Sequence, residues 1–494
     1  MSEPFDLIVI GGGVNGAGIA RDAQGRLAGR GGKVLLLEAR DLASGTSSAS
    51  TKLVHGGLRY LEYYEFALVR EALHEREILW GIAPHIVRPL RFVLPWMPHL
   101  RPRWMLRLGL LLYDHIGGRK RLPAADTLRL AHHAAGAALR PELDWAFEYS
   151  DLAVDDARLV VLNAMDAREK GAEIRTHTPV TAARREGELW VVEAPAGTFH
   201  CRALVNAGGP GADDVAKLAG EKPRYGIRRV RGSHIVTKKL FNHPYAYIFQ
   251  LPDTRICFAI PWQSDFTLIG TTDRDHTGSL VEVAAAEDEI AYLCEAASRY
   301  FAKPVTRADV VWTFAGVRAL VDDGSGRPEA ATRGYRLPIS DPAEGAPLLG
   351  VYGGKITSYR HLAEEAVDRL AARLPALAGK PWTAKAPLPG GDFPVDALDD
   401  LVEMLAVEYE FLSQAEAERI ARAYGTRARN WLGTARSWSD LGRRFGAGLS
   451  EAELDYLRRE EWALSAEDVL WRRSKLGLHM SAAERAGVEE FMGA

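Results

Sequence analysis

Two short runs near the start of the chain are almost continuously apolar, FDLIVI at residues 5–10 and KVLLLEA at residues 33–39. Such runs are typical of strands that are buried on both faces, as in a parallel sheet. A glycine-rich turn follows the first run, and a helical pattern begins at about Asn15. The pattern therefore predicts a strand, a turn, a helix and a second strand of an α/β domain.

Later parts of the chain extend this α/β pattern and interrupt it. Further strands are predicted at residues 188–193, 203–207 and 347–352. After the last of these, Gly353-Gly354-Lys355 leads into a helical pattern that continues to Ala372. Residues 227–270 instead hold several strand-like runs separated by turn signals, which is typical of an antiparallel sheet. We therefore expect an α/β domain that a separate sheet interrupts.

The last hundred residues are predicted to be helical. Residues 386–394 (APLPGGDFP) have the Pro and Gly content of a linker. Beyond them, Ser450, Ser465 and Ser481 are each followed by an acidic residue three positions later. This spacing is the signature of a capping box at a helix start.

The composition is that of a globular protein with two or three domains. The chain has 494 residues, of which 47% are hydrophobic and 26% are charged, so a large buried core is expected. The net charge is −3 and the pI is about 6.6, which argues against nucleic acid as a partner. We expect no signal peptide, because an apolar strand already begins at Phe5, and no apolar stretch is long enough to span a bilayer.

The cysteines point to a reducing compartment. Cys201, Cys257 and Cys294 are scattered, odd in number and without C-x-x-C spacing. Neither a disulfide framework nor a zinc site is expected from this arrangement. We therefore expect a cytoplasmic protein without a metal site.

One segment, residues 88–121, is both basic and rich in leucine and aromatic residues. It holds eight arginines and lysines against a single acid, Asp114. It also contains the apolar groups Trp104-Met105-Leu106 and 110–113. A segment of this kind can lie on an anionic membrane surface. The alternative is a helix that packs on the protein with its arginines in solvent, and the sequence leaves both interpretations open.

The glycine turn after the first strand has the spacing of a dinucleotide-binding site. Gly11 allows a tight turn, Gly13 lets the backbone approach a pyrophosphate, and Gly16 lets helix and strand pack closely. The helix N-terminus adds unpaired N–H groups and a positive dipole end for the phosphates. Glu38 ends the next strand, where a carboxylate can accept hydrogen bonds from ribose hydroxyls. A dinucleotide site is therefore favoured over a purely structural turn.

A second glycine motif favours FAD over NAD. FAD is long enough to reach from the first helix across the sheet to a second helix N-terminus, which can stabilise the reduced flavin. Residues 351–360 (VYGGKITSYR) offer such a helix start, with Lys355 as a nearby cation. Residues 46–52 agree with this interpretation. Their hydroxyls can bond phosphate or ribitol oxygens, and their lysine can partner a charged or ring atom: Ser47, Ser48, Ser50 and Lys52.

Eight motifs, in order from residue 8 to residue 478, carry a family resemblance: IGGGVNGAGIARDA, TSSASTKLVHGGLRYLE, EYSDLAVDDARLV, YGIRRVRGSHIV, IGTTD, GVRAL, YGGKITSYR and DVLWRRSKLGL. In these the chain resembles the FAD-dependent respiratory glycerol-3-phosphate dehydrogenases, of the glycine-oxidase and D-amino-acid-oxidase-like flavoprotein superfamily. Departures are a long connection after the first helix, Gly211 in place of an aromatic residue and Ala319 in place of proline. None of them removes a charged site residue.

The resemblance implies a fold of three parts. The first is an α/β FAD-binding Rossmann-like domain of the glutathione-reductase type, discontinuous over residues 1–80, 150–222 and 312–386. An antiparallel-sheet substrate or cap domain over 81–149 and 223–311 interrupts it. A linker over 387–394 leads to an all-α C-terminal domain over 395–494.

The resemblance also implies oxidation of sn-glycerol 3-phosphate to dihydroxyacetone phosphate, with hydride transfer from C2 to flavin N5. Such a site needs cations for the phosphate and a proton acceptor. Arg59 and Tyr60 can hold the phosphate, and Arg318 matches the second substrate arginine of the family. His234 has an ordinary pKa that suits a general base, although a histidine bonded to strand backbone is the alternative. Lys355 can orient a water or donate toward the flavin.

Together these inferences give the expected site residues. The catalytic residues are His234, Arg318 and Lys355, and the substrate-binding residues are Arg59, Tyr60, Thr271 and Arg318. The cofactor-binding residues are Gly11, Gly13, Asn15, Gly16, Glu38, Thr46, Ser47, Ser48, Ser50, Lys52, Val180, Gly208, Gly316, Lys355, Ile356 and Thr357.

The resemblance implies electron transfer to a membrane quinone by a homodimer that is peripheral on the cytoplasmic face of the inner membrane. A glycerol-3-phosphate oxidase that produces hydrogen peroxide is the alternative. An amine or amino-acid oxidase on the same fold is more distant, because the paired arginines favour a phosphate over a lone carboxylate. A non-catalytic flavin-binding protein is the remaining class, and the charged site residues argue against it.

Overall fold

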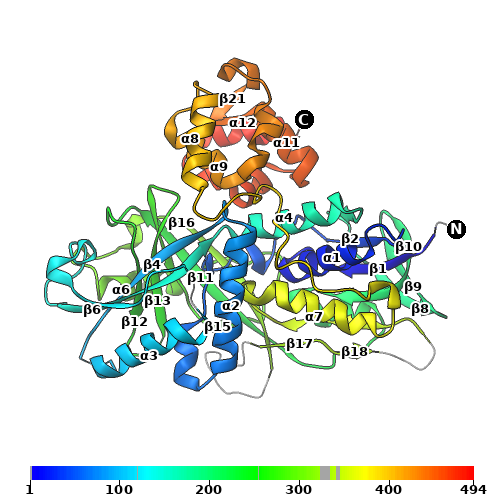
Figure 1. Cartoon of the computed structure of the whole chain (residues 1–494), viewed down its shortest axis with the longest axis horizontal. Helices are drawn as coiled ribbons and strands as arrows, with labels where there is room; N and C mark the ends of the chain where they lie inside the picture. Colours follow the sequence, from blue (N-terminus) through cyan, green and yellow to red (C-terminus); the bar gives the residue numbers. More distant parts are fainter. Residues whose placement is uncertain are drawn as a thin grey trace.

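The computed structural model describes residues 3–98, 100–118, 121–253, 255–322, 334–340 and 345–493. Two large sheets lie next to each other, and the C-terminal helices, coloured orange to red, pack on one side of them (Figure 1). The N-terminal strand belongs to one sheet, and strands from the middle of the chain form most of the other.

The first sheet contains the predicted parallel strands. β1 (Phe5–Ile10) lies between β10 (Gly197–Asn206) and β2 (Val34–Leu37), and both neighbours are parallel to it. The parallel strands β19 (Leu348–Gly350) and β7 (Glu173–Arg175) extend the sheet beyond β10 and β2, and β18 (Ile339–Ser340) is an antiparallel edge strand. β18 and β19, at one end of the sheet, therefore come from a part of the chain far from the other strands.

Both faces of this sheet are covered. Helices α1 (Val14–Leu27), α4 (Asp156–Glu169) and α7 (Tyr359–Ala371) pack on the side to which Leu7 and Val9 point. Strands β8 (Ala182–Glu186) and β9 (Leu189–Ala194) pair into the first half of β10 and cover the side of Ile8 and Ile10. Because side chains alternate between these two buried faces, the strand is apolar at nearly every position.

The second sheet has the order β15-β11-β14-β13-β12-β4-β6-β3, with β16 on the other side of β11 and β5 beside β6. Its strands are β3 (Leu53–Val54), β4 (Val87–Pro95), β5 (Asp126–Arg129), β6 (Trp145–Val154), β11 (Ile227–Lys238), β12 (Ala246–Gln250), β13 (Ile256–Trp262), β14 (Phe266–Gly270), β15 (Arg274–Asp275) and β16 (Val310–Val321). The predicted antiparallel pairing of residues 227–270 is confirmed, although β12 and β4 pair in parallel.

Helices also cover the second sheet. Helix α6 (Glu287–Ser298) packs on one face, and α2 (Phe66–Ile82) and α3 (Arg103–Ile116) pack on the other. The expected domain boundaries at residues 150 and 312 fall inside β6 and β16, since both strands belong to this sheet. The division into domains stays a prediction.

The C-terminal helices enclose a core of their own. They are α8 (Leu398–Glu408), α9 (Gln414–Tyr424), α10 (Arg429–Leu432), α11 (Glu451–Glu461) and α12 (Ala482–Gly493), with a π-helical turn at Asp468–Arg473 and a small hairpin of β21 (Arg444–Gly446) and β22 (Leu449–Ser450). The hydroxyls of Ser450, Ser465 and Ser481 each accept a hydrogen bond from the N–H three residues on. The predicted three-part fold, with an α/β FAD-binding domain, is confirmed.

Candidate active site

The turn after β1 is built from glycines because three chain segments meet there. Gly11 has a φ of +113°, and a Cβ on it would lie 2.5 Å from the carbonyl oxygen of Ala207, which follows β10. A Cβ on Gly16 would lie only 1.9 Å from the carbonyl oxygen of Gly11. The first turn of α1 therefore rests directly on the strand end. The N–H of Val14 at the start of α1 donates to Ser47 Oγ at 3.0 Å.

Glu38 lies directly beside this turn. Its carboxylate accepts hydrogen bonds from the N–H groups of Gly12 at 2.5 Å and Arg40 at 2.9 Å. Burial raises the pKa of Glu38, and these N–H groups oppose that rise. The structure therefore has a carboxylate at the end of β2, as predicted.

The two glycine motifs, far apart in sequence, are in contact. The side-chain amide of Asn15 donates to the Gly353 carbonyl at 3.4 Å, and a Cβ on Gly354 would lie 3.3 Å from Asn15 Nδ2. Gly353 and Gly354 have φ values of +78° and +95°, which side chains rarely permit. Thr357, in the 3-10 turn before α7, accepts a hydrogen bond from the His55 N–H at 3.3 Å.

These residues fit the predicted flavin. Bare glycine backbone lies at the N-terminus of α1 and again at the start of the turn before α7. In addition, Asn15 Oδ1 is buried and accepts no hydrogen bond from any described residue. An unpaired buried acceptor is costly unless a ligand satisfies it. A long dinucleotide that spans both turns meets these requirements.

Residues 46–52, here called the hydroxyl loop, are bonded to neighbouring elements. Thr46 Oγ1 donates to the Val317 carbonyl at 2.5 Å. Lys52 Nζ is buried, donates to the Ser48 carbonyl at 2.7 Å and pairs with the carboxylate of Asp156 on α4 at 2.9 Å. Ser50 Oγ donates to the same carboxylate at 2.8 Å. Within the protein, Ser50 and Lys52 therefore fix the loop, and their contacts with the cofactor stay predictions.

The other predicted cofactor residues border the same region. Gly208 donates its N–H to Asn206 Oδ1 at 3.2 Å just after β10. A Cβ on Gly316 would lie 2.6 Å from Ala49 Cβ, so β16 passes close to the hydroxyl loop. Val180 packs partly buried against the first sheet, and Ile356 packs against the core that α1 and α7 share.

His234 lies in the second sheet, on the strand next to β16. On β11 it faces Gly270 of β14 on one side and Phe314 of β16 on the other. Its ring stacks on the Phe314 ring, with centroids 4.7 Å apart and an angle of 10° between the planes. Nε2 is hydrogen-bonded to Thr51 Oγ1 at 3.0 Å, whereas Nδ1 is buried without a partner among the described residues. Burial, assisted by the charges of Arg318 and Lys52, lowers the pKa of His234 well below its ordinary value.

Arg318 and the predicted IGTTD residues lie together. The guanidinium of Arg318 pairs with the Asp273 carboxylate and donates to Thr271 Oγ1 at 3.0 Å. A Cβ on Gly232 would lie 2.5 Å from Arg318 Nη2, and one on Gly270 would lie 2.1 Å from the His234 ring. Two glycines thus make room for these side chains. Motifs that lie far apart in the sequence therefore meet in the middle of β11, where it pairs with β14 and β16.

Lys355 and Tyr60 form a further contact, in which Lys355 Nζ lies 3.8 Å from the centroid of the Tyr60 ring. Arg59 belongs to the 3-10 turn Leu58–Tyr63, but its side chain lies outside the described part of the structure. The proposed role of Arg59 in phosphate binding therefore stays a prediction.

Sequence reasoning missed three residues around this site. Asp156 holds Lys52 and Ser50, Thr51 is bonded to His234, and Phe314 carries the ring on which His234 stacks. Asp156 stands in the motif EYSDLAVDDARLV, and Thr51 stands in the hydroxyl run, so both could have been named. Phe314 has no signal beyond its place in a strand.

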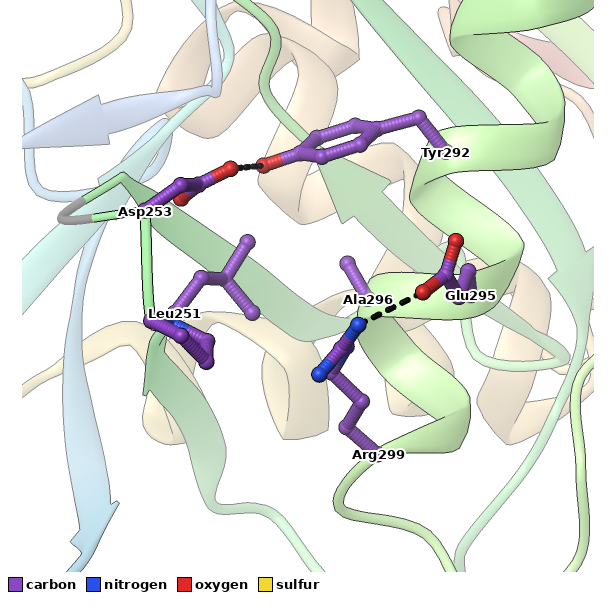
Figure 2. A pocket seen from close by; sticks show the side chains of 7 residues that line it. Leu251, Asp253, Tyr292, Glu295, Ala296 and Arg299 are labelled. Carbon is purple, nitrogen blue, oxygen red and sulfur yellow. Dashed lines mark hydrogen bonds and ion pairs between the residues drawn. The ribbon is translucent and has the colours of Figure 1, made fainter. Parts of the chain in front are cut away.

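A cavity of about 120 Å³ lies elsewhere, between α6 and the connection after β12. Figure 2 shows its lining side chains, where Asp253 is paired with the Tyr292 hydroxyl at 3.2 Å and Glu295 with Arg299 at 2.6 Å. None of the predicted site residues lines it. Its charged groups satisfy one another, so it is a poor candidate for the active site.

Comparison with known proteins agrees with this geometry. Residues 6–354 match the model of the FAD dependent oxidoreductase family, and residues 381–492 match that of the C-terminal domain of alpha-glycerophosphate oxidase. The chain is 50% identical to a glycerol-3-phosphate dehydrogenase of Pseudomonas aeruginosa, over 100% of this chain and 96% of that protein. The chain belongs to the family of FAD-dependent glycerol-3-phosphate dehydrogenases.

Two further proteins are similar to the chain over its whole length. A D-erythritol 1-phosphate dehydrogenase of Brucella abortus is 49% identical, over 99% of this chain and 98% of that one. The crystal structure of the glycerol-3-phosphate dehydrogenase from Bacillus halodurans, complexed with FAD, matches with a TM-score of 0.76 and 25% identity, over 100% of this chain and 94% of that one. The predicted enzyme class, an FAD-dependent glycerol-3-phosphate dehydrogenase, is confirmed, and so is the predicted cofactor, FAD.

Proposed function

We propose that the protein oxidises sn-glycerol 3-phosphate to dihydroxyacetone phosphate and passes the electrons to a membrane quinone. The observation that carries this proposal is the grouping of His234 with Arg318 and Thr271 in the middle of β11. His234 is in turn bonded to Thr51 of the hydroxyl loop. The names of close relatives support a phosphorylated polyol as substrate.

In this proposal the cofactor is held by the two glycine turns. Gly11, Gly13 and Gly16 hold the pyrophosphate against the N-terminus of α1, and Glu38 binds a ribose. Gly354 and Lys355 border the ring at the other turn. When bound, FAD supplies the two-electron acceptor for the hydride that leaves C2 of the substrate.

His234 takes the proton of the C2 hydroxyl as the carbonyl forms. A histidine with a lowered pKa is neutral near pH 7, so it has a lone pair with which to accept a proton. We assign the ring hydrogen to Nε2, where it is donated to Thr51 Oγ1. This tautomer leaves the lone pair on Nδ1.

Arg318 binds the phosphate. A guanidinium can meet two phosphate oxygens with a pair of parallel N–H groups. Asp273 and Thr271 already fix its plane, so less conformational freedom is lost when the substrate binds. Tyr60 and Arg59 are proposed to complete the phosphate site.

The test is anaerobic mixing of the yellow holoenzyme with glycerol 3-phosphate. We expect bleaching of the flavin band, and absence of bleaching contradicts the substrate assignment. His234→Gln keeps a polar group of similar size, and we expect it to slow bleaching by about 10²- to 10⁴-fold. Arg318→Lys keeps the charge but not the fork, and we expect mainly a weaker apparent affinity. D-erythritol 1-phosphate in the same assay tests the second candidate substrate.

The electron acceptor separates the dehydrogenase from the oxidase. The match of the C-terminal region to alpha-glycerophosphate oxidase favours keeping the oxidase as the second candidate. Reduction of a soluble quinone analogue with little peroxide supports the dehydrogenase. Stoichiometric peroxide with no quinone reduction supports the oxidase.

For the membrane surface we propose the outward face of α3. Trp104, Leu108, Leu111 and Leu112 follow helical spacing and are 66%, 57%, 47% and 41% exposed, respectively. The opposite side of α3 packs on the protein through Leu110 and Tyr113. The helix therefore has features of both interpretations that the sequence left open. None of the helices within the described ranges is long and apolar enough to cross a bilayer.

Sedimentation with anionic liposomes tests this surface. We expect the double variant Trp104→Glu/Leu108→Glu to lose binding at low salt. Val407→Glu on α8 is the control, because Val407 is 75% exposed on another helix. If the wild type, the double variant and Val407→Glu are retained equally, membrane attachment through α3 is contradicted. The expected homodimer stays a prediction that sedimentation velocity measures.

A further inference from the structure

One short segment of the C-terminal region, residues 468–475, reaches into the surroundings of the active site. It consists of the π-helical turn Asp468–Arg473 followed by Ser474 and Lys475. π-Helical turns are uncommon and are often found at functional sites. This segment makes three separate contacts with the structures that hold His234 and the hydroxyl loop.

The first contact is a row of stacked rings. Trp471 stacks on Trp312 with centroids 4.9 Å apart and an interplanar angle of 17°. Trp312 lies against Phe314 at 5.1 Å, and Phe314 stacks on the His234 ring at 4.7 Å. Trp312 and Phe314 are alternate residues on β16, so their side chains point to the same face of the sheet. The row therefore leads from the C-terminal region to the proposed base.

The second contact fixes the start of the hydroxyl loop. Arg472 and Arg473 each bond the carboxylate of Asp41 at 2.7 Å. Asp41 follows β2 and Glu38 and precedes Thr46, and it is almost completely buried, as is Arg473. Paired guanidinium groups thus hold the loop where it leaves the first sheet.

The third contact lies at the start of α4. Lys475 Nζ donates to the carboxylate of Asp155 and to the Arg472 carbonyl. Burial tends to raise the pKa of Asp155, but the ammonium of Lys475, together with the N–H and guanidinium of Arg158, keeps the pKa below its ordinary value. The next residue, Asp156, binds Lys52 and Ser50 of the hydroxyl loop. Lys475 therefore holds Asp155 in place, next to Asp156, which binds the hydroxyl loop.

We propose that residues 468–475 position His234 and the hydroxyl loop, and that Trp471 is a positioning residue for the proton-accepting step. The three contacts enter by different routes, through β16, through Asp41 and through α4, and they converge on the same two elements. Buried ion pairs add little net stability because of their desolvation cost, but they fix geometry. The inference rests on the proposed function, because it takes His234 as the base.

The test compares four variants with the wild type, all as holoenzymes. Trp471→Ala removes the end of the ring row, Trp471→Leu keeps apolar volume without a ring, and Trp471→Phe keeps a ring. Trp438→Ala is the matched control, because Trp438 is another half-buried tryptophan of the C-terminal region, where it contacts Phe411 and not β16.

We expect Trp471→Ala and Trp471→Leu to lower the limiting rate of flavin reduction by glycerol 3-phosphate about ten- to a hundredfold, the scale of a small misplacement of a reacting group. The apparent substrate affinity should change little, because Arg318 and Thr271 are untouched. Trp471→Phe should recover most of the rate, and Trp438→Ala should equal the wild type.

The pH dependence of the flavin-reduction rate separates positioning from loss of stability, because loss of stability alone does not shift it. The charged groups that face His234 are Lys52 and Arg318, and both remain in these variants. Removing the ring admits water toward the row, so the acidic limb of the rate profile should shift to higher pH in Trp471→Ala. Trp438→Ala should show no shift.

Hydrogen–deuterium exchange of the same holoenzymes, without substrate, tests the segment independently of activity. We expect faster exchange at residues 41–52 and along β16 in Trp471→Ala, and not in Trp438→Ala. Unchanged rate, pH profile and exchange in both Trp471→Ala and Trp471→Leu overturn the inference. If the wild type is not reduced by glycerol 3-phosphate, the proposed function fails, whereas the exchange result still decides whether the segment holds the loop.

Discussion

The ion pair between Arg158 and Glu461 joins the C-terminal helices to the FAD-binding part. Arg158 on α4 donates two hydrogen bonds to the Glu461 carboxylate, at 2.9 and 2.8 Å, and the two side chains are 2% and 0% exposed. Burial opposes the charge of Arg158, but the carboxylate outweighs it and raises the pKa of the guanidinium. Glu461→Leu would leave this guanidinium buried without its counter-charge.

We expect Glu461→Leu to lower the free energy of unfolding by about 3–5 kcal/mol, the usual cost of removing one partner of a buried pair. If the whole chain unfolds together, the entropy of unfolding for this length makes that a fall in Tm of roughly 3–5 °C. If the C-terminal helices unfold as a unit of about a hundred residues, the same loss lowers their transition by roughly 15–25 °C. Calorimetry therefore measures both the energy and the cooperativity.

Two further variants make the result interpretable. Arg158→Leu/Glu461→Leu removes both charges, and we expect it to recover most of the lost stability, since no buried charge is left unpaired. Glu460→Leu is the control, because the pair of Glu460 with Arg168 is partly exposed and contributes about 1 kcal/mol or less. A double variant as unstable as the single one would refute the reasoning. So would equal effects of Glu460→Leu and Glu461→Leu.

Three other predictions use single positions. Burial, with the charge of Arg158, lowers the pKa of His85 from its ordinary 6.5 to about 3, so acid favours the unfolded chain between these values; His85→Leu should remove about 1.4 kcal/mol of this dependence per pH unit, measured by urea unfolding at pH 7, 6 and 5. Gly270→Ala places a Cβ against the His234 ring and should slow flavin reduction at least about tenfold while FAD is retained; an unchanged rate would mean that the ring position does not matter. Gly16→Val forces α1 away from β1 and should give a colourless protein, which the visible absorption spectrum checks.

The first sheet and its glycine turn could be predicted because local sequence determines them. The run from Phe5 to Ile10 faces two apolar surfaces, and Gly11 and Gly16 are required by contacts within a few residues or at a strand end. Such requirements leave a pattern that periodicity and spacing can detect. The antiparallel pairing of β12 with β13 and of β13 with β14 was predictable for the same reason, because the turns between these strands are short.

The surroundings of the site were less predictable because they depend on residues far apart in sequence. Lys52 could have faced a ligand or an acid, and only the fold shows that Asp156, more than a hundred residues later, takes it. Phe314 gave no chemical signal, yet its ring fixes the plane of His234. Nothing in the sequence indicated that Trp471 would reach that row.

The parallel strand β19 has a consequence for biosynthesis. Strand β10 pairs with β1 on one side and with β19 on the other, and β19 is encoded about 140 residues after β10. At ordinary elongation rates the ribosome needs roughly 7–30 s to make the intervening chain. During that interval the nascent sheet has an unpaired edge, the kind of surface that recruits strands from other chains. Chaperone contacts with the nascent polypeptide should therefore concentrate in this window.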